Sequence, residues 1–532
     1  MPKAWKVSPH YSDNLVEQFL YNRSIKTKAG KDKFLNPNLE DYKKDLEIPG
    51  IEKAKKRILQ AVENKELVIV YGDYDADGVC GAAVLYLGLT SLGAKVLPYI
   101  PHREKEGYGL SEEGLKSVKE KGASLVITVD NGIVANKEAE FAQGLGLDLI
   151  ITDHHTLSDK KPKALAIVHS TGMSGAGVAW CLIRQLVEED VALELLDLVA
   201  IATICDMVQL LGVNRALVKI GLEKLNKTKR IGLLALIDQS GLQRGAITAY
   251  NVGHVLGPRI NAMGRLEHAM DSLRILCTKD KEKAEKLAGV LTETNDQKKK
   301  LAMDAVLQAK EMINEDISFQ GKKILVLHSE SWISGIVGLV AGRICDEYRK
   351  PTIIISSAEG QGKGSARSGN GFNVVEAIRQ CSDILVDVGG HPRAAGFTIA
   401  TENITLFRER LEKIAEMVEA EEDVLQVEAV VKTENINKRM VKDLDLFEPT
   451  GVSNPQPVLA SLEVKISDIK TVGQGQHLKF TVDGIDAIAF SFGKRVEDLK
   501  DGQKVDLAYY LELNKFNGQE KLQFKIIDIK LI

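Results

Sequence analysis

Residues 66–78 read ELVIVYGDYDADG, and this stretch decides how the rest of the sequence is interpreted. The apolar run 67–71 has the length and composition of a buried strand, and Gly72 ends it. Acidic side chains crowd the residues that follow: Asp73, Asp75 and Asp77. Aspartates titrate near ~4, so these carboxylates are ionised and repel one another at pH 7. We therefore expect a divalent cation among them.

The whole chain has the composition of a soluble globular protein, with 44% apolar and 27% charged residues. Its 532 residues are too many for a single hydrophobic core, so we expect several domains. The net charge of −4 argues against a protein that is basic throughout but allows a local basic groove. The six cysteines include no CxxC pair, which indicates reduced thiols. We see neither a signal peptide nor a membrane span, and expect a cytoplasmic protein without a membrane partner.

Strand and helix patterns alternate through the first part of the chain. A helical pattern at 51–64 is followed by the strand that precedes the acids, and a helix is expected from Gly78. Further apolar runs typical of strands lie at 95–100, 124–130, 147–153 and 164–169. Strands separated by helices predict an α/β fold with a parallel, doubly wound sheet.

The second half of the chain predicts three more structural parts. Residues 281–316 form a helical run, interpreted as a connector between two lobes or as a peripheral helix. Strand patterns at 322–328 and 351–356 indicate a smaller α/β unit, and 425–532 alternates like the strands of a small OB-like β-barrel, with Asn517-Gly518 as a hairpin turn. The domains we expect are an N-terminal segment packed on the first domain (1–50), a catalytic domain (51–270), a connecting helix (271–318), a substrate-binding domain (319–420) and the barrel (425–532).

Two further strands of the first domain also end in potential metal ligands. Asp130 lies in TVDNG, His154 and His155 follow Asp153 in ITDHH, and Asp206 is expected inside an apolar helix. Each one alone is also typical of a helix cap or a satisfied buried acid. Parallel strands bring their carboxyl ends together, however, so these side chains can converge on Asp75 and Asp77. Such a hard, oxygen-rich set suits two Mn²⁺ or Mg²⁺ ions bridged by one aspartate, which is an arrangement that hydrolyses phosphoesters.

Two glycine-rich stretches in the smaller α/β unit are candidate phosphate-binding loops, with tight turns as the alternative. They are GKGSARSGNG (362–371) and VGGHPRAAGFTI (388–399). Glycine lets backbone N–H groups approach an anion, and arginine and histidine add positive charge. The charged residues concerned are Lys363 and Arg367 in the first stretch and His391 and Arg393 in the second.

Basic residues near the middle of the chain are further candidates for nucleic-acid contacts. GPRINAMGR (257–265) carries Arg259, Asn261 and Arg265, and IPHREKEGYGL (100–110) carries Arg103 and Tyr108. A basic loop with an aromatic residue can hold a sugar–phosphate chain and stack a base, although a solvated loop has the same composition.

Taken together, these motifs resemble a known family. DYDADG, TVDNG, TDHH and the helical Asp206 resemble the four metal motifs of the DHH phosphoesterase superfamily, and GGHPRAAGF is similar to the signature of its DHHA1 domain. From about residue 30 to the end, the order of motifs and domains resembles the RecJ family of bacterial single-strand-specific 5′-to-3′ exonucleases. One departure is Ile333, which stands where that family often has histidine.

The resemblance implies roles for matching residues. Asp75, Asp77, Asp130, His154 and Asp206 would hold the two ions, with Asp130 as the bridge and, with His155, as a catalytic residue. Asp73 would support these ligands from behind. His391 with Gly389 and Gly390 would clamp a phosphate that Ser365 and Arg367 help to hold. In the barrel, Phe480, Phe516 and Lys479 are candidate DNA contacts.

The resemblance also implies a function: exonucleolytic degradation of single-stranded DNA in repair and recombination, in a channel between the lobes that is too narrow for a duplex. A single-strand-binding protein and a helicase are candidate partners. One alternative is a DHH-family phosphodiesterase for short oligoribonucleotides or cyclic dinucleotides, which would not need the barrel or the long helix. A non-enzymatic replication scaffold is a weaker alternative, because every expected metal ligand is present.

Overall fold

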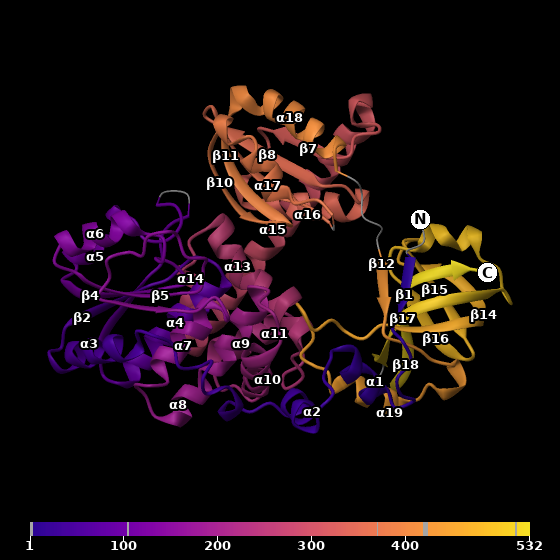
Figure 1. Cartoon of the computed structure of the whole chain (residues 1–532), viewed down its shortest axis with the longest axis horizontal. Helices are drawn as coiled ribbons and strands as arrows, with labels where there is room; N and C mark the ends of the chain where they lie inside the picture. Colours follow the sequence, from indigo (N-terminus) through magenta and orange to yellow (C-terminus); the bar gives the residue numbers. More distant parts are fainter. Residues whose placement is uncertain (1–3, 104–105, 370, 419–423, 517–518) are drawn as a thin grey trace. The chain divides into compact units, whose positions relative to one another are not determined.

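In the computed structural model, a parallel five-stranded sheet with the order β3-β2-β4-β5-β6 forms the centre of the first half of the chain (Figure 1). The chain runs from β2 to β3 on one side and then crosses to β4 on the other, so the strand order reverses between β2 and β4. Ligands of open α/β sheets bind at such a switch point, beyond the carboxyl ends of the strands. The strands are β2 (Leu67–Tyr71), β3 (Lys95–Tyr99), β4 (Ala123–Val129), β5 (Asp148–Asp153) and β6 (Ala166–His169).

Helices cover both faces of this sheet, as predicted (Figure 1). On one face lie α5 (Glu112–Glu120) and α6 (Asn136–Gly144), and on the other α3 (Ile51–Glu63), α4 (Ala76–Ser91) and α7 (Gly175–Ile183). Most residues of α4 are buried, because it lies between the sheet and the helices α7 and α9 (Leu196–Cys205). Asp206 is the residue at which α9 ends, which corrects the expectation that it lies inside a helix.

The structure describes residues 4–103, 106–369, 371–418, 424–516 and 519–532, and only the backbone of 515, 516 and 519. These residues form two compact units. Unit 1 comprises the described residues of 4–101, 106–257 and 424–532, and unit 2 comprises those of 102–103 and 258–418.

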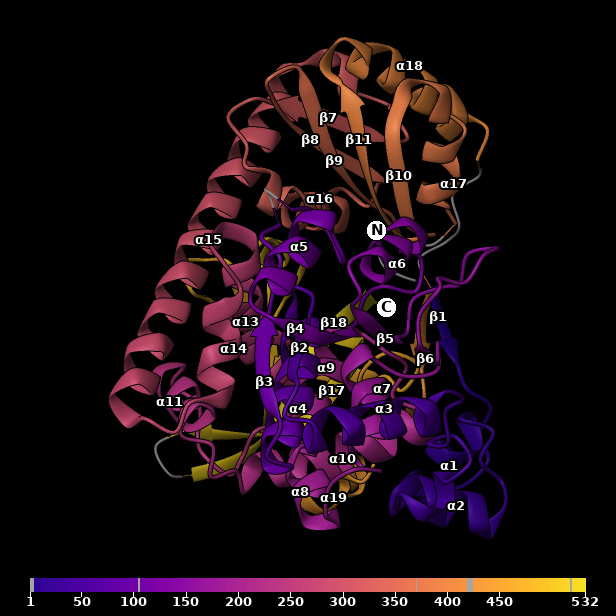
Figure 2. The ribbon, with the colours of Figure 1, turned by 90° about the vertical axis from the view of Figure 1, so that its left-hand side faces the viewer.

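Unit 2 combines a long helix with a second sheet (Figure 2). The predicted long helix is α15 (Lys281–Glu315), and it packs against α16 (Val337–Tyr348). The sheet has the order β10-β11-β9-β8-β7. Its strands are β7 (Leu325–Ser329), β8 (Thr352–Ala358), β9 (Gln361–Arg367), β10 (Leu385–His391) and β11 (Ala394–Ala400).

Both glycine-rich stretches expected to be loops therefore contribute strands. Their glycines are accommodated by the sheet itself. A Cβ on Gly364 would lie 2.1 Å from the ring of Phe397 on the neighbouring strand, so only glycine leaves room for that ring. Low β-propensity is outweighed here by packing across strands.

The C-terminal part of unit 1 is the expected OB-like barrel. Strands β14, β15, β16, β18 and β17 pair in this order, and β14 pairs back with β17 to close the ring. Closure pairs both ends of this five-stranded ring with each other, and the inward residues of β15 alternate with outward ones. The hairpin turn expected at 517–518 lies outside the described residues. The strands are β14 (Leu459–Val472), β15 (His477–Val482), β16 (Ile485–Ala489), β17 (Lys504–Phe516) and β18 (Gln519–Leu531).

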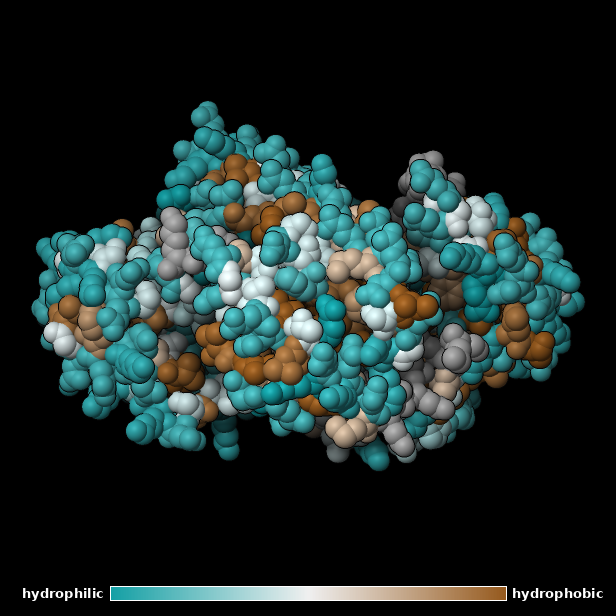
Figure 3. Space-filling model, turned by 90° about the horizontal axis from the view of Figure 1, so that it is seen from above, coloured by the Kyte–Doolittle hydropathy of each residue, from teal (hydrophilic) through white to brown (hydrophobic). Residues whose placement is uncertain are grey.

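The face of the molecule seen in Figure 3 is largely hydrophilic, with apolar residues in separate patches. Among the described residues, no helix is both long and apolar enough to cross a membrane. The apolar residues of each unit instead meet in internal clusters.

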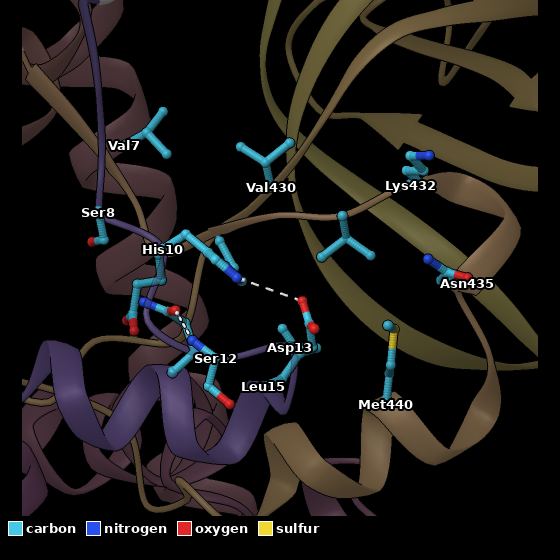
Figure 4. A pocket seen from close by; sticks show the side chains of 14 residues that line it. Val7, Ser8, His10, Ser12, Asp13, Leu15, Val430, Lys432, Asn435 and Met440 are labelled. Atoms are coloured by element: carbon cyan, nitrogen blue, oxygen red, sulfur yellow. Dashed lines mark hydrogen bonds and ion pairs between the residues drawn. The ribbon is translucent and has the colours of Figure 1, made fainter. Parts of the chain in front are cut away.

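The N-terminal segment, which the sequence analysis expects on the first domain, also contacts the barrel. Helices α1 (Leu15–Asn22) and α2 (Lys28–Leu35) place Phe19, Leu20 and Phe34 in the core of the barrel. Strand β1 (Ala4–Val7) pairs with β12 (Val424–Val427). A cavity of about 570 Å³ lies between this segment and the barrel, and none of the expected metal or phosphate residues lines it (Figure 4).

Candidate active site

The acidic residues of the first domain meet at the switch point of the parallel sheet. Asp73, Asp75 and Asp77 follow β2, and Asp130 is the first residue after β4, which pairs with β2. His154 follows the last residue of β5, the next strand of the sheet. The convergence expected from the sequence is therefore present.

Backbone amides fix the carboxylates of Asp75 and Asp77. Asp75 caps α4, and its Oδ1 accepts hydrogen bonds from the amides of Asp77 (2.9 Å) and Gly78 (3.0 Å). Asp77 accepts one bond on each oxygen from the first turn of α7, from Gly175 N (2.6 Å) and Ala176 N (2.7 Å). Charge-assisted bonds of this kind hold both side chains before any ion binds.

Asp130 is placed by an uncommon backbone conformation. Its φ is +64°, which is in the left-handed region that aspartate tolerates better than most residues. Its amide donates to Thr152 O (3.0 Å), and Thr128 and Asn131 brace the same turn through a 2.8 Å bond. A Cβ on Gly175 would lie 2.7 Å from the Cβ of Asp130, so the start of α7 closes over this carboxylate.

His154 lies at the centre of three carboxylates. Its Nε2 is 3.1 Å from Asp130 Oδ1 and 3.6 Å from both Asp77 Oδ2 and Asp206 Oδ2. Neighbouring ligands of an octahedral ion with bonds of ~2.1 Å are roughly 3.0 Å apart. The three distances from His154 Nε2 are thus close to the spacing between neighbouring ligands of one ion.

Asp153 holds the histidine loop rather than facing the acids. It is buried and accepts bonds from Ile133 N, His154 N and His155 N. Its Oδ1 also lies 2.8 Å from His155 Nδ1. Burial opposes ionisation of Asp153, but these bonds outweigh it and lower the pKa of the carboxyl. Likewise, burial opposes the charged form of His155, but the bond to Asp153 raises the pKa of the imidazole.

Tyr108 reaches the same region. Its hydroxyl donates to Asp130 O (3.0 Å) and lies 3.2 Å from His155 Nε2. Its side chain remains half exposed, so it borders the acidic cluster and solvent at once.

In the part of the chain that the structure describes, three groups of side chains have ligand atoms within 4.8 Å of one another, and the groups overlap. The first is Asp130, His154 and His155; the second is Asp77, His154 and Asp206; the third is Asp73, Asp75 and Asp130. Asp130 and His154 are each shared by two groups, as a site for two ions requires. Asp73 lies within the same distances as the expected ligands, so the geometry does not restrict it to a supporting role.

The electrostatics of the cluster favour a bound cation. Burial, reinforced by the neighbouring aspartates, raises the pKa of Asp77 and Asp130, and burial together with Asp75 raises the pKa of Asp206 to about 7. Burial and the adjacent His155 lower the pKa of His154 to about 4, so its imidazole is neutral and able to bind metal. Among the described residues, Asp130 Oδ1 is buried without a hydrogen-bond donor. Hard divalent ions fit such oxygens.

In unit 2, the expected phosphate residues share one face of the sheet. In the register of β9, β11 and β10, Ser365 lies opposite Gly396, which lies opposite Gly389. Two residues further along β9, Arg367 lies opposite Ala394, which lies opposite His391. Adjacent strands are ~4.8 Å apart, so Arg367 and His391 flank a shallow floor roughly 10 Å wide that is lined by small residues. Arg367 Nη1 donates to Ser365 Oγ (3.0 Å), and this bond holds the guanidinium on this face of the sheet.

The first turn of α16 lies over this face. A Cβ on Gly338 would be 3.1 Å from both Arg367 Nη2 and Ser365 Oγ. The N-terminus of a helix favours anions, and it adds to the positive charge here. Gly390 takes a φ of +141° where the hairpin begins to turn, which places His391 at its tip.

Four of the candidate nucleic-acid contacts from the middle of the chain are also in unit 2, and three of these lie on a helix that the sequence did not predict. Arg259, Asn261 and Arg265 belong to α13 (Gly257–Leu266). Arg259 is nearly buried, with Nε donating to Thr292 Oγ1 (3.3 Å), and Arg265 Nη1 donates to Gly335 O (3.1 Å). Arg103 lies in the loop after β3 and is partly exposed.

The structure alters which barrel residues can contact DNA. Phe480 is 1% exposed in the barrel core, so it cannot stack on a base. Lys479 lies 3.7 Å from Asp486, and the side chain of Phe516 lies outside the described part.

The sequence did not reveal that the amides of Gly175 and Ala176 bind Asp77. The signal was the stretch SGAG after a predicted strand, which is typical of a helix start that binds an anion.

Comparisons with known proteins agree with this arrangement along the chain. The model of the DHH family, N-terminal domain, matches residues 67–203, and that of the DHHA1 domain matches residues 321–417. The model of the RecJ OB domain matches residues 427–528.

Individual relatives match over most of the chain. The single-stranded-DNA-specific exonuclease RecJ of Bacillus subtilis is 37% identical over 97% of this chain and 67% of its own length. The crystal structure of RecJ from Thermus thermophilus in complex with Mn²⁺ is similar with a TM-score of 0.86, at 29% identity, over 99% of this chain and 79% of that one. The Mg²⁺ complex from the same organism gives a TM-score of 0.79 at 27% identity, covering 99% and 78%.

Proposed function

The chain belongs to the RecJ family of DHH exonucleases, and on this premise we propose that it is a metal-dependent exonuclease that degrades single-stranded DNA. Its cofactors are divalent cations, Mn²⁺ or Mg²⁺, as in the complexes of its Thermus relative. The observation that carries this conclusion is the overlap of three potential ligand groups through Asp130 and His154 at the switch point of the sheet.

We assign the residues of unit 1 as follows. Asp75, Asp77, Asp130, His154 and Asp206 would hold the divalent ions, with Asp130 shared by two of the three ligand groups, and Asp73 would support or join this set. When bound, the ions polarise the phosphodiester and lower the pKa of water. Asp153 orients His155, which with Tyr108 is placed to contact the reacting phosphate.

We assign the phosphate of the DNA end to unit 2. Arg367, Ser365 and His391 present donors on one sheet face, and Gly389 and Gly390 keep its floor open. Arg259, Asn261, Arg265 and Arg103 are further candidate contacts for the sugar–phosphate chain. Specific capture of a terminal phosphate supports an exonuclease over an endonuclease.

Polarity and cellular setting follow from the family resemblance. We propose 5′-to-3′ degradation, with the 5′ phosphate at Arg367, and a cytoplasmic role in DNA repair and recombination. A single-strand-binding protein and a helicase are the partners we expect, because they would supply and expose the strand. The alternative of a phosphodiesterase for oligoribonucleotides or cyclic dinucleotides is not favoured, since the chain carries the RecJ OB domain.

End-labelled digestion tests this function and its direction. Single strands with a 5′ phosphate, a 5′ hydroxyl or a blocked 3′ end, a blunt duplex and dinucleotides are each incubated with Mn²⁺, and the products are sized. We expect mononucleotides from the 5′ side of single strands, no effect of the 3′ block, and little cleavage of the duplex. Degradation of dinucleotides with survival of long strands would contradict the proposal.

A further inference from the structure

Asn131, the residue after Asp130, is fully buried at the switch point of the sheet and is not among the proposed metal ligands. It lies between two residues with a left-handed backbone, Asp130 (φ +64°) and Gly132 (φ +107°). Its Nδ2 donates to Val129 O (2.9 Å) and to Tyr71 O (3.3 Å). The first bond closes the turn locally, and the second connects the end of β4 with the end of β2.

The bond to β2 lies where the two strands stop pairing. The register between β2 and β4 ends at Tyr71 and Thr128. Beyond this point, the amide of Gly72 donates to β3 and the amide of Asp130 donates to β5. The side chain of Asn131 therefore ties together two segments whose backbones are bonded to different neighbours.

These two segments carry two parts of the candidate metal site. Asp75 and Asp77 follow β2, whereas Asp130 follows β4. The separation of Asp130 from the other two carboxylates thus depends on how closely the ends of β2 and β4 approach each other. Paired catalytic ions lie ~3.5–4 Å apart, so even a small change in this separation would affect a ligand that they share.

The oxygen of the same amide costs stability. Among the described residues, Asn131 Oδ1 is buried without a hydrogen-bond donor. Gly109 covers it, because a Cβ at that position would lie 3.5 Å from Asn131 Cβ and 3.9 Å from Oδ1. A buried acceptor without a donor is unfavourable and rare in folded proteins. An apolar side chain would avoid this cost, but it could not donate to the ends of β2 and β4.

A role in the turn alone would require less than an asparagine amide. Short polar side chains often bond a nearby backbone group in turns, and the single donor of a serine is enough for this. The bond to Tyr71 O reaches a residue 60 positions away in the sequence. It uses the second N–H of the amide, which serine lacks.

We propose that Asn131 is a positioning residue that sets the separation between Asp130 and the ligands that follow β2. This proposal rests on the proposed function, in which Asp130 is shared between ligand groups, and adds the residue that holds it in register with the others. The role is carried by Nδ2 and its two carbonyl acceptors, so Asn131 acts through Asp130 rather than on the ions.

Binding of Mn²⁺ to the full chain, followed by calorimetry and by electron paramagnetic resonance, tests this role without substrate. With saturating Mn²⁺, the wild type should give the signal of a spin-coupled pair of ions. We expect Asn131→Ser, which keeps one donor for the turn, to bind the second ion roughly 10–100-fold more weakly. Its spectrum should be that of isolated Mn²⁺. Asn131→Leu, which removes both donors, should show the same loss.

Asn136→Leu is the matched control, because the amide of Asn136 also donates to two backbone carbonyls, Val134 O and Lys160 O, but joins two loops rather than two strands. It should leave the ion pair unchanged. Unfolding temperatures in EDTA identify the folded variants, and Asn131→Ser, the milder change, decides the result if Asn131→Leu does not fold.

A folded Asn131→Ser variant with wild-type affinity and a coupled pair would overturn the positioning role and leave the proposed function intact. If the wild type itself binds no pair of Mn²⁺ ions, the proposed metal site fails and this role fails with it.

Discussion

Asp130 has a strained, left-handed backbone conformation and is deeply buried. Among the described residues, its Oδ1 has no hydrogen-bond donor. Each property costs stability when no cation is bound, and each would favour binding of a cation by this carboxylate. The folded protein is therefore less stable than it would be without these features, but its cation site is already formed, as is common where backbone strain occurs at functional sites.

Replacing Asp130 by Asn tests this exchange, because asparagine has the same shape and tolerates the same backbone. Mn²⁺ at about 100 times its dissociation constant should stabilise the wild type by about 2.7 kcal/mol. We expect Asp130→Asn to lose this gain and at least roughly 100-fold in metal affinity, since even outer-shell changes cost 10–100-fold. In EDTA the variant should unfold at a higher temperature than the wild type, because one buried charge is gone. Equal metal-dependent shifts in both proteins would contradict the ligand role.

Arg367 decides recognition of the strand end in this proposal. Without its guanidinium, Ser365 and His391 cannot neutralise a doubly charged phosphate. Because a hydrogen bond to a charged group contributes about 1.5–3 kcal/mol, we expect Arg367→Ala to reduce the preference for 5′-phosphate over 5′-hydroxyl strands by roughly 10–100-fold. Arg367→Lys should recover part of it, since it keeps the charge without the fork. The measurement is the ratio of kcat/KM for the two substrates, and an unchanged ratio would place the phosphate elsewhere.

At the scale of elements, the start of α7 supports the metal site without contributing a ligand. Gly175 presents its amide to Asp77 and leaves room for Asp130. The added methyl group of Gly175→Ala would displace Asp130, so we expect metal affinity to fall roughly 10–100-fold with every ligand retained. Titration with Mn²⁺ monitored by calorimetry measures this.

Gly289→Ala serves as the control for that substitution, because Gly289 is also helical but has no atom near its Cβ position. It should leave metal binding unchanged and stabilise unit 2 by up to ~1 kcal/mol. If the two alanine variants bind Mn²⁺ equally well, the close approach of α7 to Asp130 does not matter for the site.

Local sequence patterns predicted the elements that carry the metal site. The apolar runs that end in Asp130 and Asp153 are typical of parallel strands. Such strands are covered by helices on both faces of the sheet, so their side chains are apolar without interruption. Asp206 was harder to place, since the apolar residues of α9 conceal where that helix ends.

Long-range packing explains what the sequence could not predict. The glycine-rich stretch around Gly364 resembles a loop until Phe397 is brought against it from another strand. Phe480 and Phe490 are equally aromatic, and only barrel closure decides that the first is buried and the second exposed. Helix α13 was missed because its glycines and proline oppose a helix that tertiary contacts support.

At the scale of the whole molecule, one buried side chain connects three distant parts of unit 1. Arg215 on α10 (Gly212–Asn226) is 1% exposed, and its guanidinium packs 4.0 Å from the ring centroid of Phe34. All of its N–H donors are used. They bond to backbone carbonyls of the N-terminal segment and of the segment before the barrel: Phe34, Leu446, Phe447, Glu448 and Pro449.

Arg215→Met would fill the space but leave these buried carbonyls without donors. We expect the free energy of unfolding of unit 1 to fall by about 3–5 kcal/mol, as when a partner of a buried charged group is removed. Arg215→Lys should recover only part, because an ammonium has fewer donors and no fork. Urea unfolding followed by circular dichroism measures the loss, and Arg244→Met, which removes an exposed arginine, is the control. If Arg215→Met unfolds at the same urea concentration as Arg244→Met, attachment of the barrel depends instead on the apolar contacts of Phe19 and Phe34.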